Sequence, residues 1–205
     1  MAISKTKNKR VKNTKINKKT GGVKKTTKRT EVYFKVKVNG REVQHPARKF
    51  WIATGLIFLP LIVGLVSSAI TSNAMLAFGK LNQPPLAPPA WLFPVAWTIL
   101  YILMGVASYL IYRLNPKTKQ EKKLQTAELL VYFVQVFFNF MWTILFFRLE
   151  LRWFAFGWLI AMWLMILALI CMCAKNRKAA AWCLVPYLLW CTFASYLNIM
   201  IAILN

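Results

Sequence analysis

The apolar residues of this chain are concentrated in five long segments that contain no charged side chain. Each segment holds at least 19 residues, close to the roughly 20 that an α-helix needs to cross a hydrocarbon layer about 30 Å thick. An open strand would leave backbone groups without hydrogen-bond partners in lipid, so we expect helices. The five predicted transmembrane helices are residues 50–72, 88–112, 129–147, 153–174 and 179–205.

The pattern before residue 50 is different and divides the chain into two parts. Residues 1–30 consist mainly of Lys, Thr and Asn, a composition that cannot build a core and predicts disorder. Apolar residues then alternate with polar ones up to Asn39 and Gly40, which indicates a short hairpin at residues 32–44. The predicted fold is therefore an all-α, five-transmembrane-helix bundle at residues 50–205, preceded by a basic, mostly disordered extension at residues 1–49.

The Lys and Arg residues divide unevenly between the two ends of the predicted helices. Of 28, 17 precede residue 50, and eight more lie in the connections after the second and fourth segments. Only Lys80, Arg148 and Arg152 lie in the other connections. Because cytoplasmic loops are enriched in Lys and Arg, we expect a multi-pass membrane protein with its N-terminus on the cytoplasmic side.

The net charge of +23 belongs mostly to the extension. Membrane lipid surrounds the predicted helices, and we expect the extension to contact anionic lipid headgroups. A targeting role is a second interpretation, although the extension is rich in Lys rather than Arg and lacks an apolar helical stripe. Nucleic-acid binding is the least favoured of the three.

No catalytic or metal-binding constellation is present in the five predicted spans. The chain has no Asp, its Glu residues fall in the extension or at predicted membrane edges, and its single histidine is His45. Acid–base catalysis and metal ligation therefore have no candidates within the spans, and proton-coupled transport is disfavoured. We expect the thiols of the four cysteines to act as small apolar groups in the fourth and fifth spans.

Aromatic and amide residues recur at helical spacing on three spans, so that each set lies on one face of its helix. One interpretation is helix packing with interhelical amide hydrogen bonds, and the other is an aromatic cavity for a flat apolar ligand. The three faces carry Trp97, Tyr101, Met104 and Ser108 on the second span, Gln135, Asn139, Trp142 and Phe146 on the third, and Tyr187, Trp190, Ala194 and Asn198 on the fifth.

The connection after the first span, roughly residues 73–87, leads into a proline-rich run. Proline fixes φ and removes a backbone donor, which predicts a stiff, extended segment ending at a helix start. Connections of this length often act as lids over a binding site, although a simple connector is the alternative. The lid prolines are Pro84, Pro85, Pro88 and Pro89.

Three runs of sequence resemble one family. The run PPAWLFPVAWTILYILMGVASYLIY at residues 88–112, QVFFNFMWTILFF at 135–147 and PYLLWCTFASYLN at 186–198 are similar to the TspO/MBR family of tryptophan-rich sensory proteins and mitochondrial translocator proteins. The resemblance implies a bundle that is usually dimeric and binds porphyrins such as protoporphyrin IX and haem. Sterols and benzodiazepine-type drugs are ligands of some members. If the source is eukaryotic, the resemblance implies a location in the mitochondrial outer membrane.

The resemblance also implies roles for particular residues. Trp97 and Trp190 match the two family tryptophans that line the pocket, Asn139 matches the amide of the third helix, and Ala194 matches a small residue facing the ligand. We expect no cofactor to be required and a tetrapyrrole to be the ligand. With no histidine in the spans, it would be held by its face and propionates.

The chain departs from the family pattern at two motifs. The lid commonly carries Lys-Pro-x-Trp before the Pro-Pro pair, where this chain has residues 83–86, Gln-Pro-Pro-Leu. The sterol motif of animal members needs Lys or Arg soon after a tyrosine such as Tyr196, and none follows here. Cholesterol is therefore a less favoured ligand than a tetrapyrrole.

Two other functions remain open at this level. Family members have been proposed to degrade porphyrin under light and oxygen, which needs no acid–base pair, although we favour a binding protein over an enzyme. The third possibility is a membrane scaffold without a ligand, in which small-residue pairs such as Gly64 with Ser68 support helix contacts.

Overall fold

The computed structural model describes residues 4–6, 33–38 and 41–205, and the chain divides into two compact units, Met1–Thr54 and Gly55–Asn205. The predicted disorder of residues 1–30 falls almost wholly outside the described residues. In the first unit, β1 (Ser4–Thr6), β2 (Tyr33–Val38) and β3 (Arg41–Pro46) form an antiparallel sheet in the order β1-β2-β3. β2 and β3 pair across the region where the hairpin was predicted, and its two turn residues lie outside the described range.

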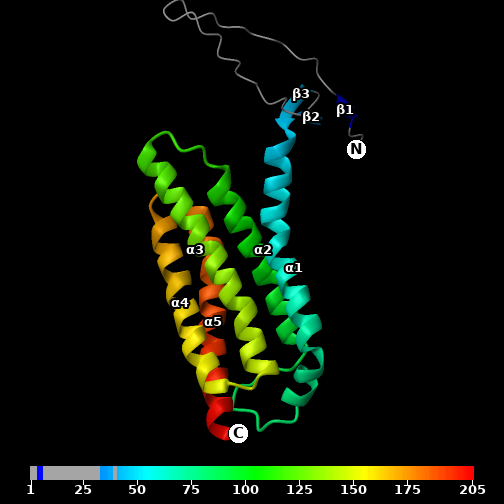
Figure 1. The fold of residues 1–205 in the computed structure, drawn as a ribbon, viewed down its shortest axis with the longest axis vertical. Helices are drawn as coiled ribbons and strands as arrows, with labels where there is room; N and C mark the ends of the chain where they lie inside the picture. The colour runs from blue at the N-terminus through cyan, green and yellow to red at the C-terminus, as the bar shows by residue number, and fades with distance from the viewer. Residues whose placement is uncertain (1–3, 7–32, 39–40) are drawn as a thin grey trace, which may run out of the picture. The chain divides into compact units, whose positions relative to one another are not determined.

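Five long helices account for the predicted membrane spans, and each is long and apolar enough to cross a bilayer. The five-helix fold predicted from the sequence is therefore confirmed, and Figure 1 shows α2 to α5 running alongside one another. The helices are α1 (Ala47–Phe78), α2 (Leu92–Arg113), α3 (Lys119–Thr143), α4 (Arg152–Ala174) and α5 (Lys178–Leu204).

The helix boundaries differ from the apolar segments where polar residues continue a helix. α3 begins at Lys119, ten residues before the predicted start, because Thr118 caps it by accepting a hydrogen bond from the backbone N–H of Glu121 at 3.1 Å. α1 continues to Phe78, so the following connection starts at residue 79. α2 begins at Leu92, after the prolines rather than at them.

The end of α3 is not α-helical. The segment η1 (Ile144–Arg148) forms a π-helical turn, in which the backbone N–H of Leu149 bonds to the carbonyl of Ile144 at 3.0 Å. Such turns insert one extra residue into the helix and occur frequently at functional sites. This turn therefore changes which side chains of the third span face inward after Thr143.

The core of the second unit lies between α2, α3, α4 and α5, where Met104, Tyr132, Met162 and Tyr187 are fully buried. α1 approaches α2 at Gly105, where an added Cβ would overlap the carbonyl oxygen of Ile57. Much of the rest of α1 is exposed, as expected for a helix whose outer face contacts lipid. Its exposed apolar side chains within the second unit include Phe58, Ile62, Leu65, Val66 and Ile70.

Candidate functional site

A cavity of about 380 Å³ lies within the second unit, and its walls come from α1, α2, the end of α3 with η1, and α5. It occupies the half of the bundle nearest the connection at residues 79–91, since its α2 residues come from the first three turns of that helix. We call this half the lid half. Its aromatic lining residues are Phe93, Trp97, Tyr101, Trp142, Phe146, Phe147, Trp190 and Phe193.

Six of the nine residues predicted to bind a ligand line this cavity. The three helical faces deduced from spacing therefore converge on one space, with α2, α3 and α5 each contributing. The six are Trp97, Tyr101, Trp142, Trp190, Ala194 and Asn198.

Trp97 is at the centre of the aromatic lining. Its ring stacks on Tyr101 with centroids 5.4 Å apart, and it meets Trp142 at 6.5 Å, Tyr187 at 6.4 Å and Trp190 at 6.4 Å. The contacts with Tyr187 and Trp190 are edge-on, at interplanar angles of 64° and 83°. Offset and edge-on contacts at these distances are favourable, so the cluster holds the Trp97 ring in one orientation.

Gln135, Asn139 and Tyr187 are not among the residues that line this cavity, and their contact with a ligand stays a prediction. They are buried behind its wall. The Tyr101 hydroxyl donates to Oδ1 of Asn139 at 2.9 Å, and Nδ2 of Asn139 donates to the Tyr187 hydroxyl at 3.2 Å. Asn139 thus acts as the interhelical amide link that the alternative interpretation predicted, and it supports a lining residue from behind.

A second polar link fixes the wall formed by Trp142. Its indole N–H donates to Oδ1 of Asn198 at 3.1 Å, and Nδ2 of Asn198 donates to the carbonyl of Arg152 at 2.8 Å. Because the indole N–H is already used, Trp142 offers the cavity its ring and not a hydrogen bond.

The predicted lid prolines lie in the connection at residues 79–91 and do not line the cavity, whereas Ala90, Phe93 and Pro94 after them do. The connection is tied to α5 and to the residue that follows α5. The Tyr196 hydroxyl donates to the carbonyl of Pro85 at 2.7 Å, and the Asn205 amide oxygen accepts from the backbone N–H of Asn82 at 2.9 Å.

One wall of the cavity was missed, because no residue of the first span was singled out as a ligand contact. The signal was present in a stripe of small and hydroxyl residues at positions 64, 67, 68 and 71, all of which line the cavity. Of these, Ser67 is buried and its hydroxyl has no hydrogen-bond partner among the described residues. An unpartnered buried hydroxyl facing a cavity is suited to a polar group of a ligand.

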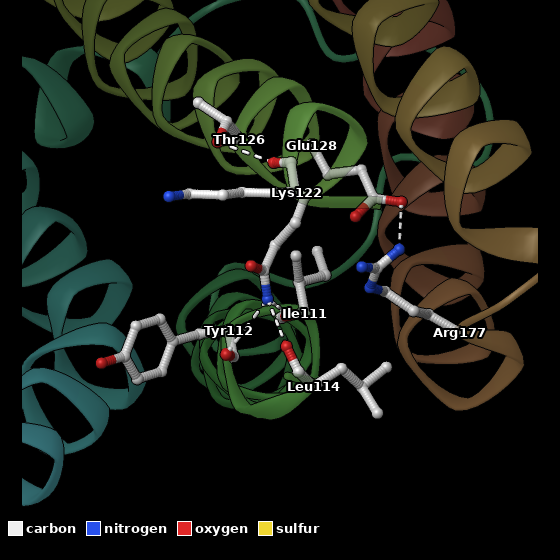
Figure 2. A network of polar contacts seen from close by, with 8 residues as sticks. Ile111, Tyr112, Leu114, Lys122, Thr126, Glu128 and Arg177 are labelled. Atoms are coloured by element: carbon white, nitrogen blue, oxygen red, sulfur yellow. Dashed lines mark hydrogen bonds and ion pairs between the residues drawn. The ribbon is translucent and has the colours of Figure 1, made fainter. Parts of the chain in front are cut away.

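Glu128, which was predicted to lie at a membrane edge, is buried among protein side chains. Its carboxylate is fully buried in α3 and pairs with the guanidinium of Arg177 at 2.9 Å, and Figure 2 shows the two side chains pointing toward each other. Arg177 comes from the turn before α5, so the pair joins α3 to that turn, at the opposite end of the bundle from the lid. We call this end, where residues 114–118 and 175–177 connect the helices, the basic end.

The cavity itself is electrically neutral. None of its lining residues is charged, and the described residues contain no cluster of three His, Cys, Asp or Glu side chains that could hold a metal ion. What the lining offers is aromatic faces, hydroxyl groups and one amide. This composition fits a flat, largely apolar molecule.

Comparison with known proteins agrees with the five helices and their aromatic motifs. The model of the TspO/MBR family matches residues 56–204. The chain belongs to the TspO/MBR family. The resemblance found in the sequence is therefore confirmed, and the whole membrane-spanning unit carries it.

Relatives within the TspO/MBR family come from bacteria and animals. The chain is 34% identical over 150 residues to "Tryptophan-rich protein TspO" of Chlorobaculum tepidum, covering 73% of this chain and 92% of the relative. It is 30% identical over 154 residues to "Translocator protein" of Bos taurus, covering 72% and 87%. The family match and the five candidate membrane spans together make the chain a multi-pass membrane protein of the sensory and translocator group.

Proposed function

We propose that this protein binds a tetrapyrrole, such as protoporphyrin IX or haem, in the aromatic cavity of the lid half and acts in its sensing or transport. The observation that carries the proposal is the ring cluster around Trp97, which presents aromatic faces and edges from three helices to one space. A flat conjugated macrocycle gains both apolar burial and ring contacts in such a space.

The neutral lining supports a particular mode of binding. Since no charged residue lines the cavity, the affinity should come from the macrocycle rather than from ion pairs with its carboxylates. Protoporphyrin IX and its dimethyl ester should then bind with similar affinity. Smaller neutral ligands, including sterols and benzodiazepine-type compounds, are compatible with the same lining.

Quenching of intrinsic fluorescence by protoporphyrin IX in the detergent-purified protein tests the proposal. Replacing Trp97→Phe or Trp190→Phe should weaken binding about fivefold each, since one favourable ring contact contributes about 1 kcal/mol. Trp182→Phe is the matched control, because Trp182 is 71% exposed and does not line the cavity. Unchanged affinity in both cavity variants would overturn the proposal.

A second candidate is degradation of the bound porphyrin under light and oxygen. It is favoured by the contacts of Trp97, whose ring meets four other aromatic rings at 5.4 to 6.5 Å and could pass oxidising equivalents among them. Illumination of the protein with excess protoporphyrin IX separates the two functions. Several turnovers per protein molecule indicate catalysis, and porphyrin spectra that remain unchanged indicate binding alone.

The orientation and assembly belong to the same proposal. The excess of Lys and Arg at the basic end and in the extension favours an N-terminus in the cytoplasm. The family favours a homodimer, and a mitochondrial outer membrane location if the source is eukaryotic. Light scattering on the detergent-purified protein tests the dimer, and protease access to a tag on residue 1 in intact cells tests the orientation.

A further inference from the structure

One face of α3 carries a column of buried polar residues that the cavity does not use. Glu128, Tyr132, Gln135, Asn139 and Trp142 follow one another at alternating steps of four and three, which keeps them within an arc of about 80° at 100° per residue. Each is at most 6% exposed. The column runs from the ion pair at the basic end to the wall of the cavity.

The part of this column nearest the basic end contains most of the unpartnered polar atoms of the described structure. Six buried side-chain atoms make no hydrogen bond of good geometry among the described residues, and five belong to the column or to its ion-pair partner. They are Oε2 of Glu128, the hydroxyl of Tyr132, both amide atoms of Gln135, and Nε of Arg177. The Tyr132 hydroxyl lies close to the Ser108 hydroxyl, and Glu128 lies close to the Cys173 thiol.

Buried polar atoms in folded proteins are paired with protein groups or with ordered water, and a buried water usually has two to four polar partners. At 1.5 Å per residue, neighbouring members from Glu128 to Asn139 are separated by about 4.5 to 6 Å along the helix axis. A water molecule that accepts from one group and donates to another, at its near-tetrahedral angle, joins atoms about 4.5 Å apart. The steps of the column along the helix axis are therefore equal to the span of one bridging water or slightly longer.

Both ends of the column reach polar surroundings. At the end nearest the cavity, Asn139 accepts a hydrogen bond from Tyr101, which lines the cavity. The cavity contains hydroxyl groups and is large enough to hold several waters when no ligand is bound. At the other end, the Glu128–Arg177 pair lies near the exposed cations of the basic end, including Lys122, Lys175 and Lys178.

We propose that the buried face of α3 holds a file of water molecules that conducts protons between the basic end and the cavity. In each step a water oxygen accepts one proton and releases another to its neighbour, so the file gains and loses none. Glu128 Oε2 is the acceptor nearest the basic end, and Gln135, with both amide atoms available, holds the central waters. The ligand-free cavity completes the path through the lid half, and a bound ligand blocks it.

Proton flux into proteoliposomes tests this proposal with the full chain. The vesicles contain a pH-sensitive dye, and a potassium gradient with valinomycin supplies the driving potential. We expect acidification at least tenfold faster than in protein-free vesicles. Gln135→Leu should reduce the flux to the protein-free level, and Tyr132→Phe, which removes only the hydroxyl, should reduce it severalfold.

Thr192→Val is the matched control, because the Thr192 hydroxyl is exposed on α5, away from the column, and should leave the flux unchanged. Thermal unfolding in detergent checks that each variant is folded, and this check does not depend on tetrapyrrole binding. The proposal is overturned if the unaltered protein conducts no faster than lipid alone, or if Gln135→Leu conducts as well as the unaltered protein. Because flux is measured without ligand, its failure leaves tetrapyrrole binding untouched, and failure of binding leaves the flux result standing.

Discussion

The Tyr101 hydroxyl donates a hydrogen bond of 2.9 Å to Oδ1 of Asn139, and this bond joins the wall of the cavity to the buried amide of α3. Tyr101 also stacks on Trp97, so the orientation of the central tryptophan depends on a polar contact behind the wall of the cavity. A single hydrogen bond between α2 and α3 thereby links the shape of the cavity to the packing of the core.

Replacing Tyr101→Phe should reduce the free energy of unfolding by about 1 kcal/mol, since it removes one interhelical hydrogen bond and leaves the Asn139 oxygen without a donor. Thermal unfolding in detergent measures the loss. Tyr109→Phe on the same helix is the control, because Tyr109 is only partly buried and does not line the cavity. Equal stability of the Tyr101 variant and the unaltered protein would show that the bond contributes nothing.

A methyl group added by Gly105→Ala should push α1 away from α2, because it would overlap the backbone carbonyl of Ile57, which cannot rotate aside. We expect a loss of about 1 to 3 kcal/mol in stability and a weaker affinity for protoporphyrin IX, as α1 forms one wall of the cavity. Gly157→Ala is the matched control, since a Cβ at that position meets nothing within 4 Å. A stable Gly105 variant with normal affinity would contradict the close approach of the two helices.

The buried pair of Glu128 and Arg177 should show strong coupling in a double-mutant cycle. Glu128→Gln or Arg177→Met alone leaves one charge buried without its partner, which costs about 3 to 5 kcal/mol. The double variant should lose much less than the sum of the single losses, because no unpaired charge remains. Additive losses, measured by thermal unfolding in detergent, would show that the two groups do not act as a pair.

The ties between the lid connection and α5 should control how fast a ligand enters and leaves. Tyr196→Phe removes the hydrogen bond to the Pro85 carbonyl, which is worth about 1 kcal/mol, and should raise both the association and dissociation rates about fivefold. The dissociation constant should change little, because the bond does not contact the cavity. Stopped-flow fluorescence with protoporphyrin IX measures both rates. Unchanged rates would show that the connection does not control ligand entry.

Much of this fold was readable from the sequence because uncharged stretches of 19 or more residues leave few alternatives to a membrane helix. Helical spacing also brought Trp97, Trp142 and Trp190 together correctly, since each lies on the inward stripe of its span. The helix ends were less predictable. Lys119 to Thr126 is mostly polar, yet it forms the start of α3 because Thr118 caps the helix and most of these side chains are exposed.

The contribution of α1 and the burial of Glu128 could not be read from spacing alone. The small residues Gly64 and Ser67 differ little in polarity from their neighbours in the first span, so the sequence does not mark them as a face. Their role depends on the space left beside Tyr101 and Trp97. Glu128 looked like an edge residue because it directly precedes the apolar segment at 129–147. Its burial was not foreseen because its partner, Arg177, is 49 positions away in the chain. Spacing within one helix reports a face, whereas pairing between helices requires their positions in space.

The π-helical turn at residues 144–148 has a consequence for comparing relatives of this chain. Because the turn adds one residue, the adjacent Phe146 and Phe147 both line the cavity, which two neighbours on a regular α-helix would do less readily. A relative with a regular helix here would place its side chains one position out of step beyond Thr143. Column-by-column alignment would then match a ligand-facing residue in one protein with a lipid-facing residue in another, so differences in ligand preference at this wall are best assigned by superposing the helices.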